Sequence, residues 1–522
     1  MTAKATFPAI SLTVKVPNQM PKFPDFHFHP GTQLRLRLSS NYFTTHPDYL
    51  VLLALSALVG AIAGLIVSMF EIAIHFMTDY RIHYFDYLGL PAWITAILVI
   101  LAGAVISALG FWMTARIAPE TSGSGIPHVE GALDGLHDIR WWRVLPVKFI
   151  AGVCTISSGM VLGREGPSVQ IGGAVGRMCA EAAKRFQYAP HVLTASGAAA
   201  GLAAAFNAPL AGILFIVEEM RPQFRYNFTS FKCITLATLT ATIVLRYFRG
   251  QEAVMDIPTF KVPPLASLWL FLALGIIFGI VGIYFNRWIL KATAAFKRYH
   301  NNRLLKVTIT GALFGGVFAF FQLYVPDMAG GGIALITTFV REPMAWVVLV
   351  ILFGLRVLAT IGCFASAAPG GVFAPMLALG TLLGLAYGII AAGLFPDLVA
   401  EPGVYAVAGM GALFAATVRA PVTGIVLVVE MTDNYQLILP LLATCLGATF
   451  IAQALGGSPL YSALLQQSLA AKAAEVNGAE ANASTNAAAV DAAIPTEGAS
   501  VSPASTDTEA SAEAQDKPSP SV

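Results

Sequence analysis

The chain has 522 residues, of which 56% are hydrophobic and only 11% are charged. An average soluble domain carries about 25% charged residues, so this chain lacks the polar surface that a soluble enzyme or a secreted disulfide-bonded scaffold needs. Its formal net charge of +2 provides no field that would attract a nucleic acid. The composition, with a mean hydropathy of +0.70, predicts a membrane protein built of several apolar helices.

Residues 1–48 form a polar, basic segment before the first apolar run. Basic residues beside a first span favour a cytoplasmic N-terminus. No apolar core followed by a small-residue cleavage site occurs in this segment, so we expect no secretory signal peptide. His27 and His29 lie here between two prolines, and we interpret them as incidental and not as metal ligands.

The expected membrane domain covers residues 49–465. Its long apolar segments are 49–75, 92–118, 264–292, 344–363 and 436–455. The shorter ones, separated by Gly and Pro, are 146–162, 168–182, 192–205, 208–220, 371–391, 403–416 and 419–431. Many of these are too short to cross about 30 Å of hydrocarbon as straight helices. Broken helices are tolerated where they face protein or a water-filled cavity, and in transporters they build the ion site.

The five cysteines lie in or beside apolar stretches without a CxxC pair, and no HExxH occurs. We therefore interpret the cysteines as small buried hydrophobic residues, and we expect neither a metal nor a cofactor. Residues 466–522 are rich in Ala, Ser, Thr and Pro, are acidic and lack aromatic residues beyond the last span. This composition predicts a disordered tail, which we also place in the cytoplasm.

Two stretches of the chain repeat. Residues 203–218 align without gaps on 415–430 at a shift of 212. A second match, at a shift of 208, pairs Gly163, Pro167, Gly172 and Gly176 with Gly371, Pro375, Gly380 and Gly384. A coincidence among common small residues is the alternative, but two matches in one order favour a true repeat. We expect two related halves, about 49–250 and 264–465, with a site at their interface.

Three segments combine glycines with a proline ahead of an apolar helix. They are Gly123-Ser124-Gly125-Ile126-Pro127, Gly163-Arg164-Glu165-Gly166-Pro167 and Gly370-Gly371-Val372-Phe373-Ala374-Pro375. Proline is favoured in a first helical turn, so each segment predicts a helix N-terminus inside the membrane. Such termini present unpaired N–H groups and bind anions without a fixed buried cation. Glycine in a membrane helix also serves close packing, which remains the alternative for any one segment.

Glu165 is an ionisable residue at expected membrane depth, where charge is costly and indicates function. A carboxylate beside helix N-termini competes with a transported anion for the same dipoles, and it loses that attraction when protonated. Glu165 is therefore a candidate for both gate and proton carrier. A salt bridge to Arg164 is the alternative.

Other candidate residues are less specific. Glu218 and Glu219 end an apolar run and are followed by Arg221 and Arg225, so a balanced interfacial pair is one interpretation. Tyr461 follows the last span, where a tyrosine is often an interface anchor. Its hydroxyl, like that of Ser124, can also donate a hydrogen bond to an anion.

With these residues assembled, the sequence resembles the CLC family of chloride channels and proton-coupled chloride transporters from about residue 49 to about 465. GSGIP at 123–127, GREGP at 163–167 and GGVFAP at 370–375 stand in the family's order. The bacterial exchangers are more similar still, through residues 201–226, 431–440 and 459–463. The resemblance implies an all-α fold of about eighteen helices in two inverted halves, and a homodimer with one pathway in each subunit.

The resemblance also implies roles for individual residues. Chloride would be held by the hydroxyls of Ser124 and Tyr461 and the backbone amides of Val372 and Phe373. The amides of Arg164 and Gly166 would frame an outer site. Glu165 would be the external gate, and Glu219 would relay protons from the cytoplasm, with Glu218 near that entrance.

Two positions indicate the subtype within the family. Exchangers carry an acid where Glu219 stands, and Ser124 is similar to the chloride-preferring version of its motif. His128 departs from the acidic residue of the close bacterial exchangers. We therefore expect an H⁺/Cl⁻ antiporter in a bacterial inner membrane. A passive chloride channel is the main alternative. An intramembrane enzyme is disfavoured because the sequence shows no nucleophile or metal set for it. A membrane scaffold is disfavoured because it leaves the buried carboxylates unexplained.

Overall fold

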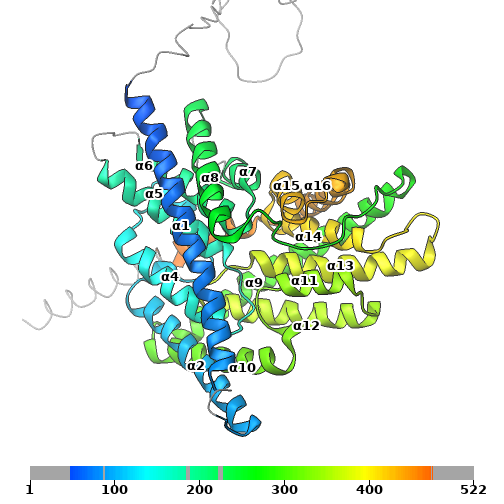
Figure 1. Cartoon of the computed structure of the whole chain (residues 1–522), viewed down its shortest axis with the longest axis horizontal. Coiled ribbons are helices and arrows are strands. Elements are labelled where there is room, and N and C mark those ends of the chain that lie inside the picture. The colour runs from blue at the N-terminus through cyan, green and yellow to red at the C-terminus, as the bar shows by residue number, and fades with distance from the viewer. Residues whose placement is uncertain (1–46, 86–88, 184–188, 221–226, 472, 474–522) are drawn as a thin grey trace, which may run out of the picture. The chain divides into compact units, whose positions relative to one another are not determined.

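The computed structural model describes residues 47–85, 89–183, 189–220, 227–471 and 473. The expectations for His27, His29 and the N-terminal segment to residue 46, and for the tail from residue 474, lie outside this part of the chain. Within it the structure is all helical, with seventeen α-helices and no strand (Figure 1). The predicted all-α fold class is confirmed.

The first eight helices follow the N-terminal half of the chain. They are α1 (Pro47–His83), α2 (Ala92–Arg116), α3 (Ile126–Leu133), α4 (Trp141–Ser157), α5 (Glu165–Ala182), α6 (Ala189–Phe206), α7 (Pro209–Glu218) and α8 (Phe228–Arg249). The next eight are α9 (Leu268–His300), α10 (Leu304–Tyr324), α11 (Ile333–Arg341), α12 (Trp346–Ala365), α13 (Phe373–Leu394), α14 (Gly403–Val418), α15 (Pro421–Thr432) and α16 (Ile438–Ala454). One more helix covers residues 460–471.

Eight of these helices are long and apolar enough to cross a membrane. Five of the eight correspond to the long segments expected from the sequence. The other three are α8 and α10, whose polar residues interrupt the apolar pattern, and α13, which was expected to be short but has 22 residues. In contrast, α14 is apolar and buried along its whole length, as a helix enclosed by other helices must be.

The two runs of helices repeat each other. Pro209, where α7 begins, and Pro421, where α15 begins, are 212 residues apart, and the same shift relates the starts of α2 and α10. Packing repeats as well: α5 packs on α6 as α13 packs on α14. The repeat seen in the sequence therefore extends over the element order from α1 to α16.

Glycines allow the backbones to meet in both of these crossings. A Cβ on Gly172 of α5 would collide with the backbone of Gly197 of α6, and a Cβ on Gly380 of α13 would collide with that of Gly409 of α14. These contacts leave no room for any side chain. The close crossing holds the N-termini of α5 and α13 at fixed positions within the fold.

Reciprocal contacts join the two runs. The carboxylate of Glu218, at the end of α7, accepts hydrogen bonds from the N–H groups of Val422 (3.1 Å) and Thr423 (2.7 Å) at the start of α15. Glu430 of α15 accepts bonds from Leu210 (3.1 Å) and Ala211 (2.9 Å) at the start of α7. Each helix thus caps its counterpart, as expected for halves related by a local two-fold axis.

Candidate functional site

The three glycine and proline motifs each precede a helix, as predicted. In the first, Gly123 (φ 66°) and Gly125 (φ 86°) adopt the left-handed conformation that glycine tolerates, and α3 begins at Ile126 with Pro127 in its first turn. The second motif opens α5 at Glu165, with Pro167 in the first turn. The third opens α13 at Phe373, with Pro375 in the first turn.

These three helix starts converge. Gly163 and Gly371 exchange two backbone hydrogen bonds, of 2.7 and 2.8 Å, so the second and third motifs are joined directly. Gly166 lies against Ser124, because a Cβ on Gly166 would approach the Ser124 carbonyl oxygen to 2.9 Å. The structure therefore brings together motifs that are about 40 and 200 residues apart in the sequence, with their positive helix ends near one another.

The Glu165 side chain is completely buried at this convergence. Its Oε2 accepts a hydrogen bond of 3.3 Å from the backbone N–H of Ala374, in the first turn of α13. Its Oε1 has no hydrogen-bond partner among the described residues. The carboxylate of one helix start therefore occupies the anion-binding end of another. The alternative partner, Arg164, instead directs its guanidinium to Glu71.

Two buried hydroxyls face the same region. Ser124 Oγ and Tyr461 Oη interact with each other but form no hydrogen bond of normal geometry to any described residue. Tyr461 is fully buried, so it is not the interface anchor that was the alternative interpretation. Because a buried hydroxyl normally has a partner, this pair has donors available for a ligand.

Val372 and Phe373 form the start of α13 and are also fully buried. The Phe373 ring contacts Phe206 (4.9 Å between centroids), the last residue of α6, and Phe414 (4.4 Å), in the last turns of α14. This aromatic packing fixes the first turn of α13. Its two N-terminal backbone groups are consequently held rigidly beside the Glu165 carboxylate.

Besides Glu165, the region contains a second group of acidic residues around Glu219. Glu219 is the C-cap residue that follows α7; it is 6% exposed and has one oxygen without a partner among the described residues. It lies within electrostatic range of Glu130 and Glu218, and Tyr461 lies within range of Glu165, Glu219 and Glu130. The proposed partners of the glutamate pair, Arg221 and Arg225, lie outside the described residues.

Sequence reasoning missed two residues of this region. Glu130 of α3 is fully buried, and neither of its oxygens has a partner in the described part of the chain. The sequence signal that could have identified Glu130 is the presence of an acidic residue in the short helix that begins within the GSGIP motif. Lys148 of α4 is also fully buried, and its Nζ donates to the carbonyls of Thr121 (2.9 Å) and Gly123 (2.6 Å). Lys148 thereby holds the loop that presents Ser124.

A cavity of about 560 Å³ reaches Ser124 from one surface of the molecule and is lined by Glu120, Arg140 and His128, among others. The His128 ring stacks on His137, with 4.6 Å between centroids. The Gln170 amide nitrogen, on α5, donates hydrogen bonds to His128 Nδ1 (3.2 Å) and to the Glu120 carbonyl (2.8 Å). The described residues contain no group of three His, Cys, Asp or Glu residues placed to hold a metal ion.

Comparison with known proteins decides the family. The voltage gated chloride channel family model matches residues 103–453. The chain belongs to this family. It is 53% identical to the H⁺/Cl⁻ exchange transporter ClcA of Vibrio parahaemolyticus over 421 residues. The aligned region covers 80% of this chain and 90% of the relative. It is 50% identical over 436 residues to ClcA of Salmonella paratyphi C, covering 83% and 92%.

Solved structures of CLC proteins have the same fold. A slow cyanobacterial Cl⁻/H⁺ antiporter matches with a TM-score of 0.77 and 41% identity, covering 81% of this chain and 99% of that one. A eukaryotic CLC transporter matches with a TM-score of 0.68 at 24% identity, over 81% and 75% of the chains. The predicted CLC fold and the family resemblance are therefore confirmed, and the protein is a membrane protein with several spans.

Proposed function

We propose that this CLC protein is a proton-coupled chloride antiporter. The observation that carries the proposal is the buried Glu165 carboxylate bound at the N-terminus of α13, where it takes the place of an anion. While it is charged, it competes with chloride for that helix end. When it binds a proton, it loses the attraction and leaves the position to chloride, so the two ions move in opposite directions.

The chloride site consists of the two orphaned hydroxyls and the rigid start of α13. Ser124 and Tyr461 donate O–H groups, and Val372 and Phe373 donate backbone amides. The backbone amides of Arg164 and Gly166 frame an outer site at the start of α5. Such a site binds chloride through dipoles, so the ion is released more readily than from a buried cation.

Protons reach Glu165 from Glu219. The support is the burial of both carboxylates and the place of Tyr461, which is within electrostatic range of each. Glu218 lies at the entrance of this route, where it also caps α15. Glu130 adds a third buried carboxylate near Glu219, and it extends the relay that the sequence indicated.

In the cell, the protein acts as a homodimer in the inner membrane of a bacterium, with both termini in the cytoplasm and one ion pathway in each subunit. The halves 49–250 and 264–465 form the transport domain together. It performs transport and no chemical catalysis. The names of the ClcA relatives and the acid at Glu219 favour this function over a passive chloride channel.

Chloride efflux and proton uptake, recorded together from liposomes that contain the purified protein, test the proposal. We expect Glu165→Gln to abolish proton movement while chloride moves uncoupled or stops. Glu219→Gln should abolish proton flux while chloride still moves, and Glu218→Gln should reduce it less. Proton pumping by Glu165→Gln in a chloride gradient would refute the gate. A wild-type reversal potential unaffected by a pH gradient would favour the passive channel.

A further inference from the structure

The short segment 455–459 joins α16 to the last described helix, 460–471, and we refer to it as the connection. Tyr461 lies in the first turn of that last helix, so the position of its hydroxyl depends on the connection. No backbone N–H group of the described residues donates to the carbonyl of Gly457 or of Ser458. The connection therefore needs side chains to hold it in one conformation.

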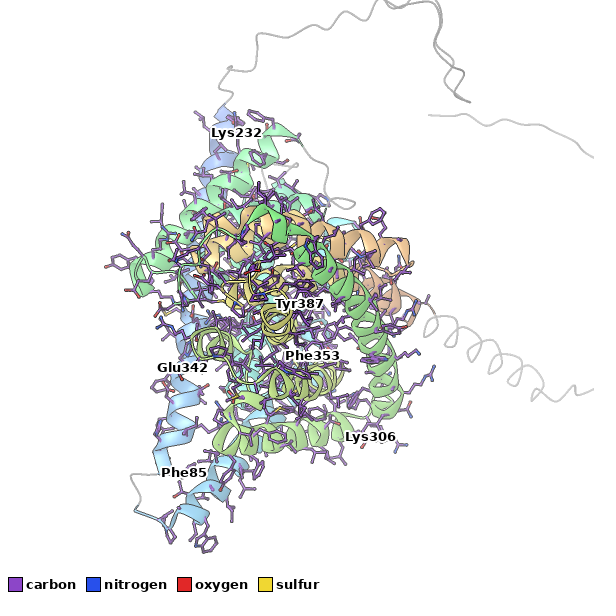
Figure 2. The ribbon with its side chains drawn as sticks, turned by 90° about the vertical axis from the view of Figure 1, so that its right-hand side faces the viewer. Phe85, Lys232, Lys306, Glu342, Phe353 and Tyr387 are labelled. Carbon is purple, nitrogen blue, oxygen red and sulfur yellow. The ribbon has the colours of Figure 1, made fainter. Side chains whose placement is uncertain are left out.

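Two side chains hold the connection. Asn286, in the second half of α9, donates from its amide nitrogen to the Ser458 carbonyl (3.1 Å). Figure 2 shows α9 along the right-hand side of the view, where it runs toward Lys306 near the start of α10. Arg419, the residue that follows α14, donates from its guanidinium to the Gly457 carbonyl (2.8 Å). Both carbonyls are thereby fixed to parts of the fold other than α16.

The Asn286 amide nitrogen also holds the end of α14. It donates a second hydrogen bond to the carbonyl of Thr417 (2.9 Å), in the last turn of that helix. The last turns of α14 also carry Phe414, whose ring packs on Phe373 at the start of α13. One amide group therefore links the packing behind the Phe373 backbone to the connection that precedes Tyr461.

Asn286 is buried, and its Oδ1 has no hydrogen-bond partner among the described residues. A buried amide oxygen without a partner costs free energy. A leucine of about the same size would avoid that cost, but it could not donate to the two carbonyls. The two donated bonds are therefore what an asparagine provides at this position.

Asn286 and Glu71 occupy equivalent positions in the two halves. A Cβ on Gly64 of α1 would approach the backbone of α8 to 2.7 Å, and a Cβ on Gly279 of α9 would approach that of α16 to 2.8 Å. Glu71 lies seven residues after Gly64, and Asn286 lies seven residues after Gly279. Glu71 pairs with Arg164 at the start of α5. In each half, this position contacts a segment that leads into a helix of the proposed ion pathway.

We propose that Asn286 is a positioning residue for the Tyr461 hydroxyl, and that it acts through the connection with Arg419 as the second donor. A hydroxyl donates to a bound anion only within hydrogen-bond distance, so a displacement of about 1 Å weakens the contact. The inference rests on the proposed chloride site at Tyr461. Its two tests separate a failure of the inference from a failure of that site.

The first test is backbone hydrogen exchange of the full-length protein in detergent without chloride. We expect Asn286→Leu to speed the exchange of residues 455–463 about tenfold, because the connection opens locally more often. Asn434→Leu is the matched control, since Asn434 is also buried and its amide nitrogen donates to the carbonyls of Pro258 (3.3 Å) and Thr432 (2.8 Å). It should leave the exchange of 455–463 unchanged. Equal exchange of this segment in wild type and Asn286→Leu would overturn the inference, whether or not chloride binds.

The second test is a double-mutant cycle of chloride affinity, measured by calorimetry. We expect Asn286→Leu to weaken chloride binding about three- to tenfold and Asn434→Leu to leave it at the wild-type value. Combined with Tyr461→Phe, Asn286→Leu should add little, because the hydroxyl that it positions is already absent. Combined with Lys148→Met, which acts on the Ser124 loop, its fold loss should multiply with the other.

The outcomes of the cycle are distinct. Fold losses that multiply in Asn286→Leu/Tyr461→Phe would overturn the inference, because Asn286 would then act without the hydroxyl. Wild-type affinity in Tyr461→Phe would contradict the proposed chloride site, and the exchange of residues 455–463 would then decide the inference alone.

Arg419→Met gives the same two readouts if Asn286→Leu does not fold. It removes the guanidinium that donates to Gly457 and leaves a side chain of similar apolar length at the same left-handed backbone position (φ 73°). We expect faster exchange of residues 455–463 and weaker chloride binding, with recovery of part of both in Arg419→Lys. A folded Arg419→Met protein with wild-type exchange of this segment would overturn the inference.

Discussion

At the scale of single residues, the site is defined by polar groups that the protein leaves unsatisfied. Ser124, Tyr461 and Glu165 are buried, and each has at least one oxygen without a hydrogen-bond partner in the described residues. Buried polar groups are normally paired, so their collection at one point indicates a ligand. We therefore expect the stability of the fold to depend little on these groups and anion affinity to depend on them strongly.

This difference leads to a prediction for Tyr461→Phe. The substitution removes a hydroxyl that forms no hydrogen bond of normal geometry to the described residues, so we expect thermal stability without chloride to remain within about 0.5 kcal/mol of wild type. Chloride affinity, measured by calorimetry in detergent, should fall about two- to tenfold because one hydrogen bond is lost. Tyr405→Phe is the matched control, since the buried Tyr405 hydroxyl also lacks a bond of normal geometry to the described residues. Equal losses of affinity in both variants would contradict the assignment.

Lys148 acts on the site through the loop that it holds. In Lys148→Met the carbonyls of Thr121 and Gly123 lose their buried donor, at a cost of about 1–3 kcal/mol for each unpaired group. We expect a lower midpoint of thermal unfolding and weaker chloride binding, because the loop no longer fixes Ser124. Normal chloride affinity in a folded Lys148→Met protein would show that the loop needs no support.

Arg356 is the counterpart of Lys148 in the second half of the chain. It follows Lys148 by 208 residues, and it donates to the carbonyls of Asp327 and Gly330 in the loop before α11. Both buried cations thus hold the loop that precedes a short helix of their own half. The sequence did not reveal this correspondence, because Lys and Arg differ and neither lies in one of the glycine motifs of the chain.

At the scale of elements, the sequence predicted helix starts better than helix lengths. Pro127, Pro167 and Pro375 mark first turns, and each helix begins where the motif places it. The spans α8 and α10 were missed because threonines and lysines interrupt their apolar runs, a pattern that neighbouring helices tolerate. The capping of α7 by the Glu430 carboxylate was also not predicted. Residues that are about 200 positions apart in the chain leave no local sequence signal of their contact.

The glycine crossings give a prediction at this scale. We expect Gly172→Ala and Gly380→Ala to destabilise the protein by about 3 kcal/mol each, because a methyl group overlaps the facing backbone in both. Gly354→Ala in α12 is the control, since no atom lies within 4 Å of the point that its Cβ would occupy, and Ala favours the helix by about 0.5–1 kcal/mol. Thermal unfolding in detergent measures all three. Similar midpoints would refute the close crossing.

At the scale of the whole molecule, the site joins elements from both halves, so an anion bound there links them. A ligand that binds only the folded state stabilises it by about 2.7 kcal/mol at 100 times its dissociation constant. We therefore expect chloride to raise the unfolding midpoint when it replaces a large organic anion at constant ionic strength. The rise should be smaller in Tyr461→Phe. An equal midpoint in both salts would contradict an anion site between the halves.

The reciprocal capping of α7 and α15 has a consequence for how the chain is made. A helix end whose cap comes from the other half lacks that cap until the other half is present. A ribosome that has released only the first half has therefore produced Glu218 without its amides and α7 without Glu430. We therefore expect the final packing of the first half to be completed only after the second half has been inserted.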